Sequence, residues 1–318
     1  CDCMEHFAHS VEREFALNVH DYYGTPSLTW AAWLRDNKYE LDPIPEEAFD
    51  IINSSIRGGQ TGAMTRYFNN EPEQLDEGSF CCDLDCNALY ATVMLKFKFP
   101  CRRWVTLTYD SNFDNRLLLD RIEQLHASGR SGFIELDFVV HDDLSLYSYM
   151  PVASKRRITG VYDYQTMRRY ATTNGEKPEN FVFTGLCNVA GEHEHYCGHT
   201  RLIEFYIRHN FITVSKVHRI TYAYEEPVFE EYVNHNLEQR KKYASDPIKK
   251  MLYKLMNNAL YGKTYEDVTQ RTDVKIILTS EFEQLDQSEI KREIMKLDKW
   301  TIYETPKRLF TMDKPIYL

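Results

Sequence analysis

The sequence lacks the features of a membrane-spanning or secreted protein. It has no run of about 18 consecutive apolar residues, and its first residues show no basic, apolar and small-residue signal pattern. It also lacks a Walker or Gly-x-Gly-x2-Gly phosphate loop, which disfavours the nucleotide-binding proteins that hold phosphates in such a loop. We therefore expect a soluble intracellular protein without membrane contact. Whether it acts in a host cytoplasm, a nucleus or a viral replication site stays open.

The cysteines lack the spacing of a disulfide framework or a zinc site. Several of the eight are adjacent or nearly adjacent, which is poor geometry for disulfide bonds and indicates a reducing compartment. No Cys-x2-Cys pair occurs, and the segment from Cys187 to Cys197, with its nearby histidines, matches no usual closed zinc site. We expect this segment to be a structural loop before a helix.

An excess of positive charge is also missing. The net charge is −10, which is unfavourable for binding nucleic acid because phosphate contacts need clustered Lys and Arg. Ordinary solvated surface explains some of the local basic clusters but not all of them: Arg102–Arg103, Lys155–Arg157, Arg168–Arg169, Arg240–Lys242 and Lys249–Lys250. With 318 residues and 43% hydrophobic content, the chain has room for two or more domains with a real core.

Residues 248–263 are the most informative stretch. Lys250 and Lys254 lie four residues apart on a predicted helix, so two like charges point the same way from successive turns. A triphosphate lying across them would offset this repulsion, whereas a solvated basic face is the alternative reading of the two lysines alone. Apolar side chains recur beside them at helical spacing and predict one buried stripe: Ile248, Leu252, Leu255 and Ala259.

A second motif lies between Phe80 and Met94. A short apolar run leads into Asp85, then a turn-forming Asn87, then another apolar segment, which predicts a strand, a tight turn and the start of a helix. This order leaves a carboxylate at the end of the strand, where it could help to hold two metal ions. Asp83 is a competing candidate, because period-two alternation puts it on the same face of the strand.

The string that begins at Lys254 resembles motif B of the protein-primed family B DNA polymerases found in viruses, organelles and transposons: Lys254-x3-Asn258-x2-Tyr261-Gly262. The resemblance is to the polinton- and adenovirus-like members. It implies that the helix belongs to the fingers and that Lys250, Lys254 and Arg240 hold the phosphates of an incoming dNTP. Asn258, Tyr261 and Gly262 would line the nucleotide pocket.

The upstream string resembles motif A of the same family: Asp85-x-Asn87-Ala88-Leu89-Tyr90. The resemblance implies that Asp85 is a catalytic ligand of two Mg²⁺ ions, with Mn²⁺ as an alternative. Tyr90 would lie beneath the sugar and reject a 2′-hydroxyl. Ala88 and Ala91 replace the usual Ser and Pro of this motif.

Two further segments carry weaker resemblances. Ile56-Arg57-Gly58-Gly59 resembles the template-binding Tyr-x-Gly-Gly segment in its Arg-Gly-Gly form, although Ile56 takes the place of the tyrosine. Adjacent glycines alone fit either a phosphate-contacting turn or a plain hairpin turn. Asp2 resembles the last metal-binding carboxylate of a 3′→5′ exonuclease, but the other exonuclease motifs are absent, so we expect no proofreading by this chain.

The resemblance implies an α+β fold with a polymerase palm, helical-hairpin fingers and inserted terminal-protein-binding subdomains. It divides the chain into six parts: an exonuclease edge (1–27), a connector with the Arg-Gly-Gly segment (28–79), the palm (80–160), a first terminal-protein region (161–225), the fingers (226–263), and a second terminal-protein region with the start of the returning palm (264–318). Within the palm, Gly132 to Val140 alternates apolar and acidic residues and predicts a half-buried strand. Its position in the family implies that Asp137 lies on the solvent side or behind the metal ligands.

Three further elements are predicted from local patterns. An amphipathic helix opens at Asp2, a second helix covers Leu28–Asp36, and a pair of strands lies around Ile212–Tyr224.

The implied function is template-directed DNA synthesis for a viral or mobile-element genome. The implied partners are template and primer DNA, dNTPs and a terminal protein that supplies the priming hydroxyl. Because motif C does not occur within residues 1–318, we expect these residues alone to be inactive in primer extension. The alternative is a non-catalytic remnant that binds nucleic acid or a terminal protein.

Overall fold

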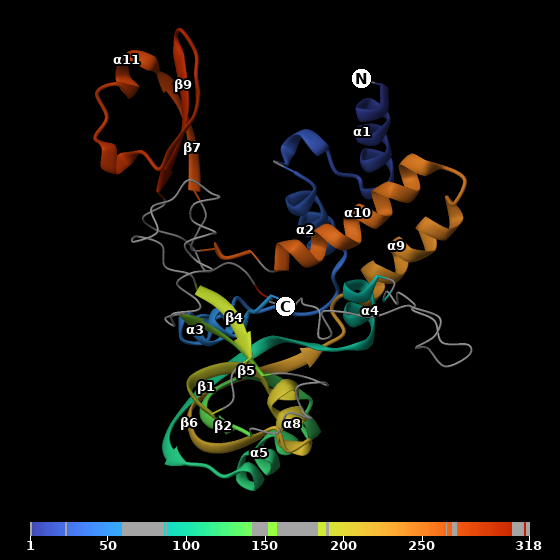
Figure 1. The fold of residues 1–318 in the computed structure, drawn as a ribbon. Helices are drawn as coiled ribbons and strands as arrows, with labels where there is room; N and C mark the ends of the chain where they lie inside the picture. The colour runs from blue at the N-terminus through green and yellow to red at the C-terminus, as the bar shows by residue number, and fades with distance from the viewer. Residues whose placement is uncertain are drawn as a thin grey trace, which may run out of the picture. The chain divides into compact units, whose positions relative to one another are not determined.

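The computed structural model describes residues 2–22, 24–58, 86, 88–141, 152–157, 184–188, 191–264, 266–268, 272–306 and 315. The chain divides into two compact units, which together contain all elements labelled in Figure 1. Unit 1 comprises Cys1–Phe49, Tyr90–Trp104 and Glu226–Leu318, and unit 2 comprises Asp50–Leu89 and Val105–Glu225. Both helices and antiparallel sheets are present, so the predicted α+β class is confirmed.

Unit 1 contains a group of helices that share one apolar core: α1 (Asp2–Phe15), η1 (Val19–Asp21), α2 (Thr25–Asp36), α4 (Leu89–Lys96), α9 (Glu230–Lys242) and α10 (Pro247–Thr264). Val11 and Phe15 of α1 are buried against Trp33 of α2 and Leu252 of α10 in this core. The predicted amphipathic helix at the start of the chain is therefore confirmed. α2 begins a little before the prediction, since Pro26 is well suited to a first helical turn.

The predicted helical hairpin is also confirmed. Figure 1 shows α9 and α10 as neighbours joined by a short turn. Asp246 ends this turn, and its Oδ1 accepts hydrogen bonds of 3.1 Å from the backbone N–H groups of Ile248 and Lys249. These two bonds satisfy N–H groups that have no partner within the helix, and Pro247 supplies a suitable φ for the first helical position.

The predicted buried stripe of α10 is wrong in its details. Leu252 is fully buried, but Leu255 is 39% exposed. The helix carries a second apolar stripe at helical spacing, Leu252, Tyr253, Met256 and Leu260, and the core buries this one. Asn257 and Thr264 are buried with it, and Asn236 Nδ2 of α9 donates a 2.8 Å hydrogen bond to Asn257 Oδ1.

Unit 2 is organised around a four-stranded sheet with strand order β1-β6-β2-β5. The strands are β1 (Phe99–Asn112), β2 (Arg130–Val140), β5 (Gly191–His199) and β6 (Ile212–Glu226), and β2 pairs antiparallel with both β5 and β6. α5 (Asn115–Ala127) and α8 (Thr200–Arg208) contact β2 and each other. Ile134, Leu136 and Phe138 alternate along β2 into this shared core, as the strand prediction requires.

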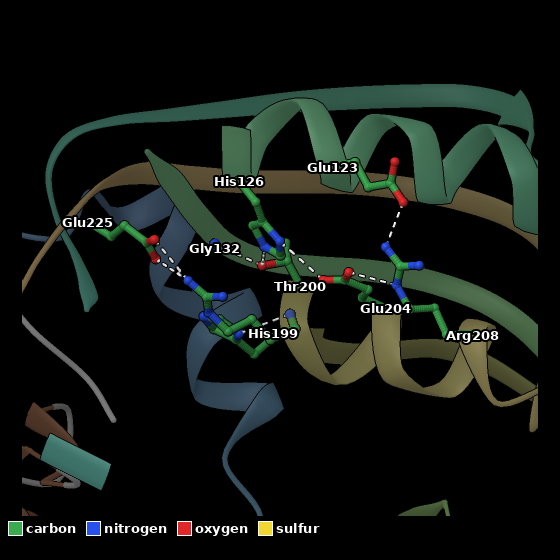
Figure 2. Close-up of polar contacts among 9 residues, drawn as sticks. Glu123, His126, Gly132, His199, Thr200, Glu204, Arg208 and Glu225 are labelled. Atoms are coloured by element: carbon green, nitrogen blue, oxygen red, sulfur yellow. Dashed lines mark hydrogen bonds and ion pairs between the residues drawn. The ribbon is translucent and has the colours of Figure 1, made fainter. Parts of the chain in front are cut away.

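Polar contacts connect α8 to its surroundings (Figure 2). Arg208 donates to Glu204 on its own helix at 2.9 Å and to Glu123 of α5 at 2.6 Å. Arg201 Nη2 donates to both carboxylate oxygens of Glu225, at 2.8 and 2.9 Å. His199 caps the start of α8, because its Nδ1 accepts the N–H of Arg201 at 3.2 Å. These contacts fix the helix against the sheet edge.

Two predictions within unit 2 are wrong. The segment from 212 to 224 is one long strand, β6, rather than a pair of strands, and β6 follows β2 through two register shifts. The segment from Cys187 to Cys197 is not a loop, because it contains the end of β4 (Thr184–Asn188) and most of β5. β6 is continuous because bulges absorb the irregular pattern without a turn.

β2 and β6 approach each other closely at Gly132. A Cβ at this position would collide with the Thr221 carbonyl, so no other residue fits there without a shift of the backbone.

The remaining elements are short. α3 (Glu46–Ser55) precedes the Arg-Gly-Gly segment, and β3 (Ala153–Arg157) pairs with β4. A three-stranded antiparallel sheet of order β7-β9-β8 follows α10; its elements are β7 (Thr272–Leu278), α11 (Thr279–Phe282), η4 (Gln287–Glu289), β8 (Arg292–Lys296) and β9 (Trp300–Pro306). Among the described residues, none of the helices has the length and apolar character needed to cross a membrane.

Candidate nucleotide-binding site

One face of α10 presents the predicted phosphate ligands to solvent. Lys250, Lys254 and Asn258 are all exposed and lie at successive steps of four residues, so they form a single row along the helix. Gly262 continues the row by one more turn. The fingers prediction requires such an open row, because a triphosphate needs several donors along one line.

The adjacent lysine shows that this exposure is selective. Lys249 lies 3.5 Å from Glu14 and 4.1 Å from the centroid of the Tyr243 ring, and its side chain is only 13% exposed. Its charge is therefore satisfied within unit 1, while the charge of Lys250 one residue later points to solvent. Arg240 is partly buried in the last turn of α9, near the turn that leads to Lys250.

Tyr90 and Tyr261 stack on each other. Their ring centroids are 3.9 Å apart and the rings are inclined by only 14°. Tyr90 lies in the first turn of α4, two residues after Ala88, whose φ of 50° is part of the tight turn that the sequence predicted. Tyr90 is still 51% exposed, so the stack leaves part of its ring open to a ligand. The two tyrosines predicted to line a nucleotide pocket therefore meet, although they are far apart in the sequence.

None of the described residues requires glycine at position 262. Gly262 lies within α10 and is exposed, its φ is not in the left-handed range, and a Cβ built on it would meet no described atom within 4 Å. Glycine within a helix is less stable than alanine by about 0.5 to 1 kcal/mol. Glycine at this position therefore lowers helix stability without relieving a clash with any described atom.

Arg57 has contacts within unit 2 that the sequence did not predict. Its Nη1 donates to the carbonyl oxygen of Ser55 at 3.0 Å and to that of Cys197 on β5 at 2.6 Å. Its guanidinium also lies 4.0 Å from the centroid of the Tyr196 ring. Gly58 beside it is exposed, and a Cβ there would meet no described atom within 4 Å.

Three predicted site residues lie wholly or partly outside the described residues. Asp85 and Gly59 fall outside them, and α1 begins at Asp2, whose side chain is not described. The described part of the chain contains no group of three or more His, Cys, Asp or Glu residues that could hold a metal ion. The predicted roles of Asp85, Gly59 and Asp2 therefore stay predictions.

A polar network on β2 was only partly foreseen. Asp137 accepts from the backbone N–H of His195 and lies next to His218 Nε2, both at 2.8 Å. Glu135 lies 2.7 Å from His195 Nδ1 and accepts from Arg219 Nε at 2.6 Å. These hydrogen bonds lower the pKa of both carboxyl groups, although partial burial opposes the shift. The acidic alternation of β2 was the available signal, but its partners come from β5 and β6.

Comparison with known proteins identifies the family. The sequence profile described as DNA polymerase type B, organellar and viral, matches residues 1–314. A search of curated proteins finds no match. Among solved structures, Phi29 DNA polymerase with primer-template DNA is 12% identical, with a TM-score of 0.49 over 97% of this chain and 44% of that chain.

The ternary complex of the same enzyme, with primer-template DNA and incoming nucleotide, is 13% identical, with a TM-score of 0.47 over 93% of this chain and 43% of that chain. This chain thus spans less than half the length of those polymerases. Because the family profile covers nearly all of its residues, the chain belongs to the organellar and viral type B DNA polymerases.

Proposed function

We propose that the protein to which this chain belongs is a template-directed DNA polymerase that replicates a viral or mobile-element genome and is primed by a terminal protein. The observation that carries the proposal is the stack of Tyr90 on Tyr261 at 3.9 Å. It joins the two motifs that the family uses for nucleotide selection, at the end of an exposed row that contains Lys250 and Lys254. A structural core pair of tyrosines would not need to stay half-exposed.

Each residue of this site has a role that its geometry allows. Lys250, Lys254 and Arg240 bind the triphosphate, because cationic donors on one face can contact several phosphate oxygens at once. Tyr261 holds the ring of Tyr90 in place, and Tyr90 then limits the space beneath the sugar. Gly262 and Asn258 leave the helix surface open, so that the new base pair can approach the backbone of α10 closely.

Asp85 is the proposed ligand for two Mg²⁺ ions, with Mn²⁺ as an alternative. When bound, such a pair supplies activation of the attacking primer or terminal-protein hydroxyl and neutralises the leaving pyrophosphate. The chain's own described residues act before that step, by holding and orienting the dNTP. The six domain assignments, template binding by Arg57–Gly59, the exonuclease origin of Asp2 and the inactivity of residues 1–318 alone also stay predictions.

The test compares Lys254→Ala with Lys241→Ala in the full-length protein. Both lysines are exposed, but Lys241 belongs to α9 and lies outside the row on α10. Loss of a charge-assisted contact costs about 1.5 to 3 kcal/mol, so Lys254→Ala should weaken dNTP binding roughly ten- to a hundredfold. Single-turnover extension of a primed template, measured over a range of dNTP concentrations, gives this value directly.

Lys241→Ala should leave the dNTP dependence unchanged, because it removes the same charge away from the row. Equal dNTP dependence in the parent and Lys254→Ala proteins would refute the assignment of the site. Failure of the parent protein to extend any primer would instead favour the non-catalytic, nucleic-acid-binding alternative.

A further inference from the structure

The contacts of Arg57 do not match those of a free phosphate ligand. A side chain that binds DNA phosphate is expected to be exposed to solvent when no DNA is bound, and Lys250 and Lys254 are both exposed. Arg57 is instead partly buried, and its Nη1 donates hydrogen bonds to two carbonyl oxygens of its own unit. Cys197 is 140 residues from Arg57 in the sequence, so this contact joins the end of α3 to the edge strand β5.

Each contact of Arg57 holds a different part of this junction. Ser55 is the last residue of α3, and its carbonyl is one of those that a helix end leaves without an intrahelical partner. The second carbonyl belongs to β5, next to Tyr196, whose side chain is almost fully buried. The guanidinium lies over the Tyr196 ring at 4.0 Å, a distance at which a cation is attracted to the face of an aromatic ring.

The arrangement requires arginine specifically. The guanidinium is planar, so it can lie flat on a ring and still direct N–H groups within its own plane to two acceptors. A lysine ammonium carries the same charge but cannot combine flat stacking with such a fork. This difference provides a way to separate the shape of the side chain from its charge.

We propose that Arg57 is a positioning residue, which fixes the start of the Arg-Gly-Gly segment to β5 so that the backbone N–H group of Gly58, rather than the Arg57 charge, contacts the template. The proposal rests on the template-binding role given to this segment under the proposed function. The open space around Gly58 agrees with it, since the absence of a side chain there serves no described neighbour. Close approach of a phosphate to backbone N–H groups is a common reason for such a glycine.

The first test measures, without DNA, how far Arg57 and Tyr196 stabilise the segment around Arg57. Amide hydrogen exchange of peptides that cover residues 52–60 should become about tenfold faster in Arg57→Lys and in Tyr196→Leu. Tyr196→Phe is the control for the hydroxyl, because it keeps the aromatic ring under the guanidinium and loses only the hydrogen bond to Tyr206. Exchange of these peptides should be faster in Arg57→Lys and in Tyr196→Leu than in Tyr196→Phe. Unchanged exchange in both Arg57→Lys and Tyr196→Leu would overturn the proposal.

The second test measures binding of a single-stranded oligonucleotide against salt concentration. Loss of one phosphate contact reduces the slope of log K against log salt by about 0.7 for single strands. A positioning role predicts weaker binding in Arg57→Lys, Arg57→Gln and Tyr196→Leu, with the parent slope retained in each. Near-normal binding by Arg57→Lys, together with a reduced slope in Arg57→Gln and normal binding by Tyr196→Leu, would show a direct phosphate contact and overturn the proposal.

The two tests also separate this inference from the proposed function. If the parent protein bound no oligonucleotide, the proposed template role would fail, and the positioning role for template with it. Faster exchange in Arg57→Lys and Tyr196→Leu than in Tyr196→Phe, with weaker binding at the parent slope, supports both.

Discussion

Gly262→Ala separates the stability of α10 from its proposed use. The position is helical and exposed, and a new methyl group would meet no described atom within 4 Å. Alanine is more favourable than glycine in a helix by about 0.5 to 1 kcal/mol, partly because it restricts the unfolded chain. Gly262 lies in the last turn, where helix ends fray, so we expect the lower part of this range, about 0.5 kcal/mol.

This gain in stability is expected to accompany a loss of function. If the nascent base pair approaches the backbone at Gly262, the added methyl group must displace it, and overpacking of this kind costs about 1 to 3 kcal/mol. Catalytic efficiency for dNTP incorporation should therefore fall roughly five- to hundredfold. A substitution that stabilises its own helix while impairing synthesis would be hard to explain by damage to the fold.

The assay measures both effects in the same protein. Amide hydrogen exchange of α10 peptides should slow about twofold, which corresponds to about 0.5 kcal/mol. Ala259→Gly, one turn earlier on the same helix, calibrates the propensity scale and should speed exchange. Faster exchange in Gly262→Ala would show that the fold itself requires glycine, and unchanged dNTP incorporation would show that nothing approaches the backbone there. Either result would refute the reasoning.

Three other substitutions or measurements test separate parts of the structure. Tyr90→Val should raise ribonucleotide incorporation with dNTP use largely retained. Tyr90→Phe keeps the ring that stacks on Tyr261 and should discriminate between dNTPs and ribonucleotides like the parent. Equal discrimination by all three proteins would make Tyr90 a purely structural aromatic. Burial, together with nearby Arg201, lowers the pKa of His199 from about 6.5 to about 3. Between pH 6.5 and 3 the unfolded state therefore binds more protons than the folded state, so the free energy of unfolding should fall as pH drops below about 6.5. His199 is partly exposed, so the loss should be smaller than about 1.4 kcal/mol per pH unit, and His199→Asn, which keeps a capping acceptor, should flatten the dependence in urea unfolding between pH 7.5 and 5. Cys86 is exposed, while burial raises the pKa of Cys101 to about 12 and that of Cys197 to about 11. A thiol reagent should therefore label Cys86 before Cys101 and Cys197 in the native protein, and early labelling of Cys197 would contradict the buried position found for it.

Local patterns in the sequence were sufficient for the elements and for part of the site. Pro247 and the flanking polar turn marked the start of α10, and alternation along 132–140 marked β2, because both signals depend on residues within one or two turns. The exposed row of Lys250, Lys254 and Asn258 follows from helical periodicity alone once the helix is recognised. The family itself could be recognised from the spacing within two short strings.

Tertiary structure decided what depends on residues distant in the chain. α10 has two overlapping apolar stripes at helical spacing, and only packing in the core of unit 1 shows that Tyr253, Met256 and Leu260 face inward while Leu255 is exposed. β6 remained one strand because its pairing with β2 absorbs two register shifts, and no local signal distinguishes a bulge from a turn.

The same limit applies to the functional residues. Residue type identified Tyr90, Tyr261 and Arg57 as candidates, but only the folded chain shows that the two tyrosines stack and that Arg57 is held by Cys197 and Tyr196. The chemistry of a side chain depends on its residue type, which the sequence gives directly. Its partners depend on which distant segments of the chain pack together in the fold. The sequence therefore determined the family and the local elements, and the tertiary structure determined which candidate side chains are free to bind a ligand and which are held within the fold.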